Sequence, residues 1–330
     1  MANTTIAAFS IDEHLRWATA RIVGREIDPE SVTFGREVEP TEPGVIADQL
    51  TDYVARISAK YPDVRRAQGI GISMIGPVDV GAKEVKRVAR KDWTPKIPGD
   101  PIIRFKNVFA AQERGLANAR LAVQNDATCG ALAEWYFREN PRTEDLGLWV
   151  YITINEGVNC GVLNVSRPLF QYRHAEIGHV FPARHPKDPF DPEKHSSCPL
   201  HLWCFEGIAS GASMRKRWGD DWSADPRAWN LEAFYVGQLC LTAMLGFRPD
   251  RLVLGGYVVH RNPEFLPMVR AAFAALNNGY IEDGKAENPA TYISAGQFDD
   301  RVNVLGALVL ALDAAVGGPR SVVDRSTTES

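Results

Sequence analysis

The sequence has no long apolar run, no strong charge of either sign and no even set of cysteines. None of its hydrophobic stretches approaches the roughly 20 residues that span a bilayer. Its 37 Lys and Arg against 41 Asp and Glu leave a net charge of −4, which argues against a nucleic-acid partner. Five cysteines in 330 residues argue for free thiols or metal ligands rather than disulfides. The sequence opens without a basic segment followed by an apolar one, so a cytoplasmic protein without membrane contact is expected.

What remains is the composition of a folded α/β chain long enough for two domains. Hydrophobic patterns predict strands at 5–11, 15–23, 31–38, 67–74, 121–123, 146–154, 161–165, 251–254 and 292–294. Helical spacing predicts helices at 43–60, 102–115, 127–137, 231–245, 264–275 and 302–316. The strand–turn–strand pattern near the start returns at 146–165, which indicates two related halves.

Histidine and cysteine gather in one segment between the predicted strand at 161–165 and the helix at 231–245. Five of the seven histidines lie there, namely His174, His179, His185, His195 and His201, beside Cys198 and Cys204. A mixed nitrogen and sulfur set suits tetrahedral Zn²⁺, and the Cys-x-x-His-x-x-Cys spacing favours His179, Cys198, His201 and Cys204 as its ligands. The alternative is a solvated loop whose histidines lie on the surface.

Two further features have alternative interpretations. Asn125-Asp126 lies between a predicted strand and a predicted helix, where an Asx residue either caps the helix or performs catalysis. Four tryptophans crowd the segment after the cysteines, and packing is favoured over stacking on a sugar ring. They are Trp203, Trp218, Trp222 and Trp229.

Several motifs occur in an order that is similar to one known family. They are Gly69-Ile-Gly-Ile-Ser-Met-Ile-Gly76-Pro77-Val78-Asp79, Asn125-Asp126, Glu176-Ile-Gly-His179, Cys198-Pro-Leu-His201-Leu-Trp-Cys204-Phe-Glu206 with Ser210-Gly211, and Leu254-Gly255-Gly256. Together they resemble the ROK family (repressor, open reading frame, kinase), in particular its bacterial fructokinase branch.

The resemblance implies an α/β protein with the actin-like (hexokinase/RNase H-like) ATPase fold, in which two related domains flank a cleft. It implies a first domain at 1–120 and a second at 121–318, with a zinc-binding insertion at 174–206. The last helix, 302–316, is then expected to pack back on the first domain, and 319–330 is expected to be a flexible tail. A homodimer is also implied.

The resemblance also assigns roles to residues. Asp126 is the implied general base, and Gly76, Asn125, Glu176, His179 and Glu206 are implied to contact the sugar together with it. Gly255 and Gly256 are the implied adenosine-side glycines. The zinc is implied to be structural.

Both phosphate-binding turns depart from the family pattern. The family's Asp-x-Gly-Gly-Thr is here Ser10-Ile11-Asp12-Glu13-His14, which we call the first turn. The family's second pattern, Gly-Thr-Gly-x-Gly-Gly-Gly, corresponds here to Asn155-Glu156-Gly157-Val158-Asn159-Cys160-Gly161, which we call the second turn. Side chains at glycine positions block close backbone approach. Each new carboxylate about 4 Å from a triphosphate costs on the order of several kcal/mol.

These departures leave two functions open. The first is ATP-dependent phosphorylation of a hexose-like sugar hydroxyl, with ATP and Mg²⁺ required only if that activity survives. The second is a kinase-derived protein without phosphotransfer, either a sugar-responsive binding module or an enzyme of ATP-independent acid–base chemistry. A transcription regulator is disfavoured because the first strand starts by Thr5, which leaves no room for a helix-turn-helix before it.

Overall fold

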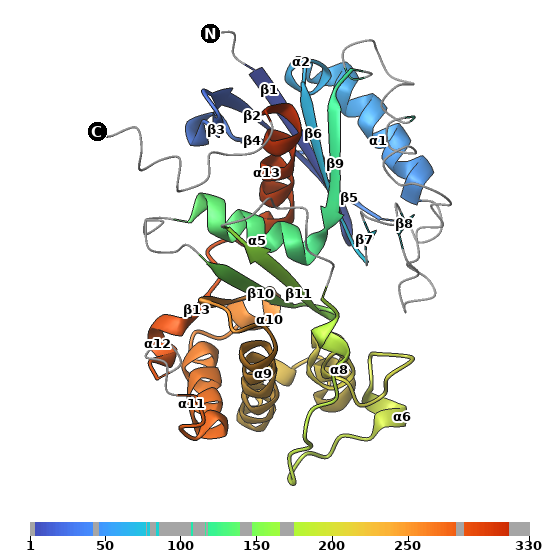
Figure 1. Cartoon of the computed structure of the whole chain (residues 1–330). Coiled ribbons are helices and arrows are strands. Elements are labelled where there is room, and N and C mark those ends of the chain that lie inside the picture. Colours follow the sequence, from blue (N-terminus) through green and yellow to red (C-terminus); the bar gives the residue numbers. More distant parts are fainter. Residues whose placement is uncertain are drawn as a thin grey trace, which may run out of the picture. The chain divides into compact units, whose positions relative to one another are not determined.

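The computed structural model describes residues 4–41, 46–76, 78–79, 84–85, 107, 116, 118–138, 147–165, 175–281 and 287–316. The chain divides into two compact units (Figure 1). Unit 1 comprises residues 1–143, 166–174 and 301–330, and unit 2 comprises 144–165 and 175–300. In the described part of the chain, every helix is too short or too polar to cross a bilayer.

Unit 1 is built on one mixed sheet with the strand order β3-β2-β1-β6-β9. Its strands are β1 (Thr4–Ile11), β2 (His14–Val23), β3 (Glu26–Ile27), β4 (Thr33–Phe34), β5 (Glu39–Pro40), β6 (Gly69–Met74) and β9 (Arg120–Asn125), with β4 and β5 paired to β2 and the small pair β7 (Val78–Asp79) and β8 (Glu84–Val85) apart. Its helices are η1 (Pro29–Ser31), α1 (Ile46–Lys60), α2 (Pro62–Arg65), α5 (Asp126–Phe137) and α13 (Val302–Val316).

Helices cover both faces of this sheet. Ile70 and Ile72 of β6 join the apolar cluster that includes Leu50 and Val54 of α1. The alternate residues of β6, Gly69 and Gly71, face α13 instead, and a Cβ on Gly71 would lie 1.8 Å from the Ala307 carbonyl oxygen. Because successive residues of a strand point to opposite faces, this alternation of isoleucine and glycine lets α13 lie directly on the backbone of β6.

The predicted domain boundary differs from the division in the structure. The sequence places it after residue 120, whereas unit 1 continues to 143. The physical reason is that β9 pairs in parallel with β6, and α5, which follows β9, packs against α13. The predicted packing of helix 302–316 on the first domain matches the contacts of α13 with β1 and β6 within unit 1.

Unit 2 repeats the core arrangement of strands. Its sheet has the order β11-β10-β12-β13, with β10 antiparallel to β11 and parallel to β12, just as β1 is antiparallel to β2 and parallel to β6. The strands are β10 (Leu148–Ile154), β11 (Val158–Asn164), β12 (Arg251–Gly255) and β13 (Ile293–Ala295). The helices are η2 (Ile177–His179), α6 (Pro192–His195), α7 (Phe205–Ala209), α8 (Gly211–Trp218), η3 (Trp222–Ala224), α9 (Pro226–Phe247), α10 (Tyr257–His260), α11 (Phe265–Asn277) and α12 (Pro289–Tyr292).

The core of unit 2 lies between this sheet and the pair α9 and α11. Val150, Ile152 and Ile154 of β10 share one buried cluster with residues of both helices. Trp222 and Trp229 belong to it, with ring centroids 4.9 Å apart, which is the packing role favoured for these tryptophans.

Two predicted elements have a different outcome. The strand predicted at 31–38 is wrong as one element, because within that range only β4 forms a strand with β2, and β5 begins after it at Glu39. Gly35 follows β4 directly: its N–H donates to the Trp17 carbonyl of β2, and a Cβ there would lie 2.0 Å from the Trp17 indole nitrogen. The helix predicted at 102–115 lies outside the described residues, apart from residue 107.

Candidate functional site

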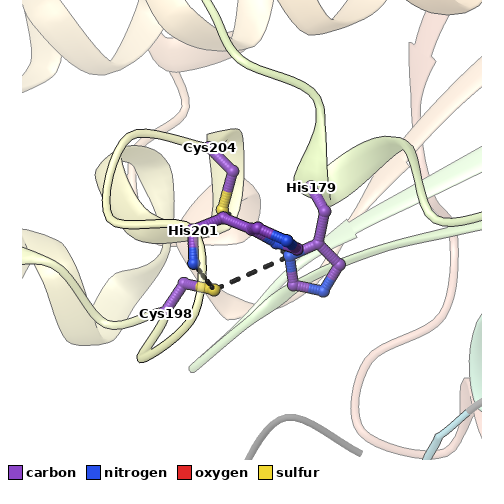
Figure 2. Close-up of side chains that lie close together, drawn as sticks. All are labelled: His179, Cys198, His201 and Cys204. Atoms are coloured by element: carbon purple, nitrogen blue, oxygen red, sulfur yellow. Dashed lines mark hydrogen bonds between the residues drawn. The ribbon is translucent and has the colours of Figure 1, made fainter.

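Four side chains from three short segments of unit 2 converge on one point (Figure 2). His179 ends η2, Cys198 and His201 lie in the loop after α6, and Cys204 directly precedes α7. We call these residues the Cys/His cluster. Their ligand atoms all lie within 4.8 Å of one another. The Nδ1 atom of His179 is 3.7 Å from the Cys198 sulfur and 3.6 Å from the Cys204 sulfur.

Backbone N–H groups support both sulfurs. The His201 N–H donates to the Cys198 sulfur and the Gly207 N–H to the Cys204 sulfur, each at 3.3 Å. The hydrogen bond between the two cysteines lowers the pKa of the Cys198 thiol and raises that of Cys204, so one of the two sulfurs is held as a thiolate. A thiolate is the form that ligates a metal, so the cluster favours the charged ligand that Zn²⁺ requires.

The cluster fits zinc. Tetrahedral coordination with ordinary Zn–S and Zn–N bonds puts sulfur and nitrogen about 3.5 Å apart, close to the separations observed here. The His201 Nδ1 atom is buried and has no hydrogen-bond partner among the described residues, which a metal bond would supply. His185 and His195 instead accept local N–H groups through Nδ1, and His174 lies outside the described residues. Four protein ligands leave no open position, so the zinc would be structural.

Glu176, which the resemblance implies to contact the sugar together with His179, lies beside this cluster. Gly178 sits between them, and a Cβ there would lie 2.2 Å from the Val158 carbonyl oxygen, so glycine lets η2 approach β11 closely. The His179 Nδ1 atom faces the sulfurs, and its Nε2 atom lies 3.8 Å from a Glu176 carboxylate oxygen. The Glu176 side chain is 47% exposed. The arrangement presents a carboxylate beside an imidazole, a pair able to hydrogen-bond vicinal hydroxyls.

Glu206 links the cysteine segment to the second turn. It lies on α7, two residues after Cys204, and its carboxylate accepts the Val158 N–H at 3.3 Å. The same carboxylate lies against Gly157, where a Cβ would be 2.7 Å from it. Glu206 therefore contacts the backbone of the second turn.

Asn125 and Asp126 lie at the junction of β9 and α5 in unit 1. The fully buried Asn125 caps α5 by accepting the N–H groups of Ala127 and Thr128. Its amide donates to the Gly76 carbonyl at 3.0 Å and to the Asp126 carboxylate at 2.8 Å. Gly76 has φ +98°, which glycine tolerates best. Asn125 therefore caps the helix and also orients Asp126, while the catalytic role of Asp126 stays a prediction.

The first turn is closed by bonds within unit 1. The Asp12 carboxylate accepts from the Arg16 guanidinium at 2.8 Å, from the His14 N–H at 2.9 Å and from the Asn303 amide at 3.2 Å. Thr41 covers the turn by donating to the carbonyls of Asp12 and Glu13. Ser10 stands where the family's first turn has its aspartate. The buried Ser10 hydroxyl has no hydrogen-bond partner among the described residues.

The second turn is closed within unit 2. The Glu156 carboxylate accepts from the Arg215 guanidinium and, at 2.9 Å, from the Tyr257 hydroxyl. Burial, and then the charge of Glu156, raises the pKa of Tyr257 to about 12, while the hydrogen bond with Glu156 raises the pKa of Arg215. The Asn155 side chain accepts the Tyr257 N–H at 2.8 Å.

Gly255 and Gly256 lie at the end of β12, where the chain itself occupies the space that they leave. A Cβ on Gly255 would lie 2.1 Å from the Tyr151 hydroxyl, and one on Gly256 would lie 2.4 Å from the Ile154 carbonyl oxygen. Gly256 also has φ +92°. Their adenosine-side role stays a prediction.

The sequence did not single out Arg16, Arg215, Tyr257 or Asn303. Tyr257 directly follows Gly255-Gly256, which is the one local signal for it. Arg215 and Asn303 are 59 and 291 residues from the acids they bind, a separation that no periodicity reveals. Asp126 and the first turn belong to unit 1, whereas the Cys/His cluster, Glu176, Glu206 and the second turn belong to unit 2.

Comparisons with known proteins agree with this architecture. The sequence model of the ROK family matches residues 26–314. A putative fructokinase of Bacillus subtilis is 28% identical over 309 residues, which cover 91% of this chain and 95% of the relative. A fructokinase of Pediococcus pentosaceus is 34% identical over 258 residues, which cover 76% of this chain and 82% of the relative. The crystal structure of a ROK family glucokinase from Streptomyces griseus in complex with glucose and AMPPNP superposes with a TM-score of 0.64 at 18% identity, covering 93% and 99% of the two chains.

The chain therefore has the actin-like α/β fold of ROK family proteins of known structure. The chain belongs to the ROK family, and its curated relatives are fructokinases. The expected family and fold class are thus confirmed.

Proposed function

We propose that this protein binds a hexose or hexose-like sugar and has lost efficient phosphoryl transfer from ATP. The observation that carries the proposal is the contrast between its two sides. The residues to which the resemblance assigns sugar contacts are present, with Asp126 bonded to Asn125, whereas the carboxylates of both phosphate turns are bonded to cationic or polar groups of the chain itself.

On the sugar side, Asp126 supplies a carboxylate oriented by Asn125, and Glu176 and His179 supply a second acceptor pair supported by the Cys/His cluster. Carboxylates, amides and imidazoles are the groups that recognise vicinal hydroxyls. If a donor binds, Asp126 is the group that would accept the proton of the attacking hydroxyl. Zinc would hold the segment that carries His179 and Glu206.

On the donor side, the hydrogen bonds and ion pairs within each turn disfavour the binding of a triphosphate. Arg16 and Asn303 engage Asp12, so the carboxylate available for Mg²⁺ in the first turn is already paired. Arg215 and Tyr257 engage Glu156 in the second turn. A bound polyphosphate would meet Asp12 where the family has glycine and Glu156 where it has threonine, and like charges repel at such distances.

The second candidate is a working ATP-dependent sugar kinase. It is supported by the relatives named fructokinase that match most of the chain, and by the glucokinase structure that holds glucose and AMPPNP. It requires the two turns to rearrange when the donor binds.

Calorimetry and thermal shift on the full chain separate these functions. Hexoses, amino sugars and cyclitols are screened by thermal shift, and a true ligand raises the melting temperature because it binds only the folded state. ATP with Mg²⁺ is titrated in the presence and absence of that ligand, and we expect no micromolar binding. Micromolar nucleotide binding, or turnover of the sugar, would establish the kinase instead.

Sugar binding is tested with two alanine variants, one in each unit. Asp126→Ala and Glu176→Ala should each weaken sugar binding at least tenfold, whereas Glu264→Ala, an exposed carboxylate at the start of α11, should leave it unchanged. Retained sugar affinity in both Asp126→Ala and Glu176→Ala would show that neither residue contacts the sugar.

A further inference from the structure

One carboxylate of the second turn is bonded by side chains from two separate helices. Glu156 accepts from Arg215, on α8, and from Tyr257, on α10. Arg215 also donates to the Tyr257 hydroxyl at 3.0 Å, so the three side chains bond one another in a ring. We call them the Glu156 cluster. The Arg215 and Glu156 side chains are 37% and 23% exposed, so the cluster lies at the surface of unit 2 and is accessible to solutes within that unit.

Backbone contacts fix the same three segments together. The Asn155 carbonyl accepts the Gly211 N–H at 2.7 Å, and the Asn155 side chain accepts the Tyr257 N–H at 2.8 Å. Gly211, the first residue of α8, lies so close to Tyr257 that a Cβ would be 1.7 Å from its hydroxyl oxygen. Tyr257 therefore fills the space beside the turn that glycine at 211 leaves.

The hydrogen-bond donors of the Glu156 cluster are of the kinds that bind phosphate in other proteins. A guanidinium and a phenol hydroxyl are both suited to phosphate oxygens. Here their acceptor is a carboxylate of the same chain. An external polyanion that approaches Arg215 must displace Glu156, which then stays nearby as an uncompensated like charge.

We propose that Glu156 is an internal anion that occupies Arg215 and Tyr257 and so excludes polyphosphate ligands from the second turn. Glu156 is then a specificity-determining residue, and Arg215 is an anion-binding group that becomes available when the carboxylate is neutralised. This inference rests on the proposed function, because it explains how one of the two turns rejects the donor.

The test is a calorimetric titration of the full chain with inorganic tripolyphosphate. Glu156→Gln preserves the size of the side chain and removes its charge, so tripolyphosphate should bind at least tenfold more tightly than to the wild type. Glu156→Gln combined with Arg215→Gln should lose that gain. Glu193→Gln, an exposed carboxylate on α6, controls for the change in net charge and should show no gain.

The inference is overturned if Glu156→Gln binds no more tightly than the wild type or Glu193→Gln, or if the gain persists without Arg215. Folding is checked by melting temperature, and Glu156→Ala carries the same test should the glutamine variant not fold. Sugar binding of the wild type, measured by thermal shift, reports on the proposed function independently. Its absence would end that function, whereas an unchanged affinity for tripolyphosphate would end only the role of Glu156.

Discussion

Asn125 combines two tasks that are usually given to different residues. Its side-chain oxygen caps α5, and its side-chain NH2 group donates to the Gly76 carbonyl and the Asp126 carboxylate. Loss of an N-cap costs about 1–2 kcal/mol. We expect Asn125→Ala to lower the free energy of unfolding by at least that amount, measured in urea, since the Gly76 carbonyl also loses its donor.

Asn125→Ser is the matched variant, because serine retains a capping oxygen but does not reach Gly76 in the same way. Its loss of stability should be the smaller of the two, while both variants should weaken sugar binding through misplacement of Asp126. Equal destabilisation by serine and alanine would show that the cap is not the main contribution.

The Cys/His cluster gives a second test at the scale of single residues. We expect about one zinc per chain by metal analysis, as four-ligand structural sites hold one ion. Cys204→Ser removes one of four ligands and should release the zinc and lower the melting temperature. Cys240, a buried cysteine of α9 outside the cluster, is the control, and Cys240→Ser should retain the zinc. Equal zinc content in both variants would contradict the assignment.

At the scale of elements, two helical glycines should respond to alanine in opposite directions. Gly306 on α13 lies against α5, and a Cβ there would be 1.9 Å from the Cys129 carbonyl oxygen. Gly306→Ala should therefore destabilise the protein by about 1–3 kcal/mol or more, as overpacking of backbone does.

Gly246, near the end of α9, is exposed, and a Cβ there would meet no atom within 4 Å. Gly246→Ala should stabilise the protein by up to about 1 kcal/mol, because alanine loses less backbone entropy in a helix. Chemical denaturation of both variants checks the pair. A neutral Gly306→Ala would mean that α13 does not lie as closely on α5 as described.

The same elements show what the sequence can predict. The strand at 67–74 and the helices at 231–245 and 302–316 were evident, because their apolar periodicity coincides with burial in β6, α9 and α13. The strand predicted at 31–38 is wrong because η1 extends to Ser31 and only Thr33 and Phe34 within that range form a strand. Spacing was sufficient to predict the Cys/His cluster, whose ligands are close in sequence. The sequence does not predict the roles of Arg215 and Tyr257, because their partner Glu156 lies on a distant segment.

At the scale of the whole molecule, the chain crosses between the two units more than once, and α13, the last described element, belongs to unit 1. α13 contacts β1, β6 and α5, so the core of unit 1 is completed only by the last described element. Sequence order and spatial domain therefore differ, which is why a single boundary drawn along the sequence misassigned β9 and α5.

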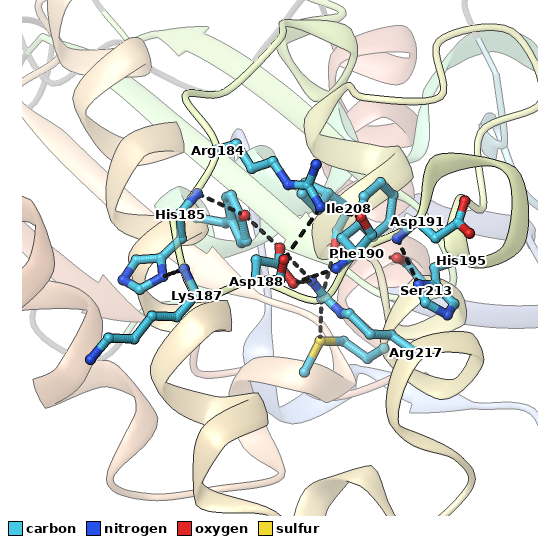
Figure 3. Close-up of polar contacts among 12 residues, drawn as sticks. Arg184, His185, Lys187, Asp188, Phe190, Asp191, His195, Ile208, Ser213 and Arg217 are labelled. Carbon is cyan, nitrogen blue, oxygen red and sulfur yellow. Dashed lines mark hydrogen bonds and ion pairs between the residues drawn. The ribbon is translucent and has the colours of Figure 1, made fainter.

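Stability of the full chain should also depend on pH through a buried charge network in unit 2 (Figure 3). Asp188 and Arg217 form a fully buried ion pair at 2.9 Å, and the Tyr235 hydroxyl donates to Asp188 at 2.5 Å. Glu232 of α9 is fully buried near this pair, and neither of its carboxylate oxygens has a hydrogen-bond partner among the described residues. Burial raises the pKa of Glu232 from 4.5 to about 8, against the opposing effect of Arg217.

Because the folded state keeps this proton while the unfolded state releases it, stability should fall as the pH rises from about 4.5 to about 8 and change little above that from this group. The loss is on the order of a few kcal/mol. Glu232→Gln stays neutral, so its advantage over the wild type in free energy of unfolding should be larger at pH 8 than at pH 5. Glu264→Gln, on the surface of the same unit, corrects for the loss of one negative charge. An advantage of Glu232→Gln that is the same at both pH values would mean that the Glu232 carboxylate is ionised in the folded protein, paired with Arg217 or hydrated.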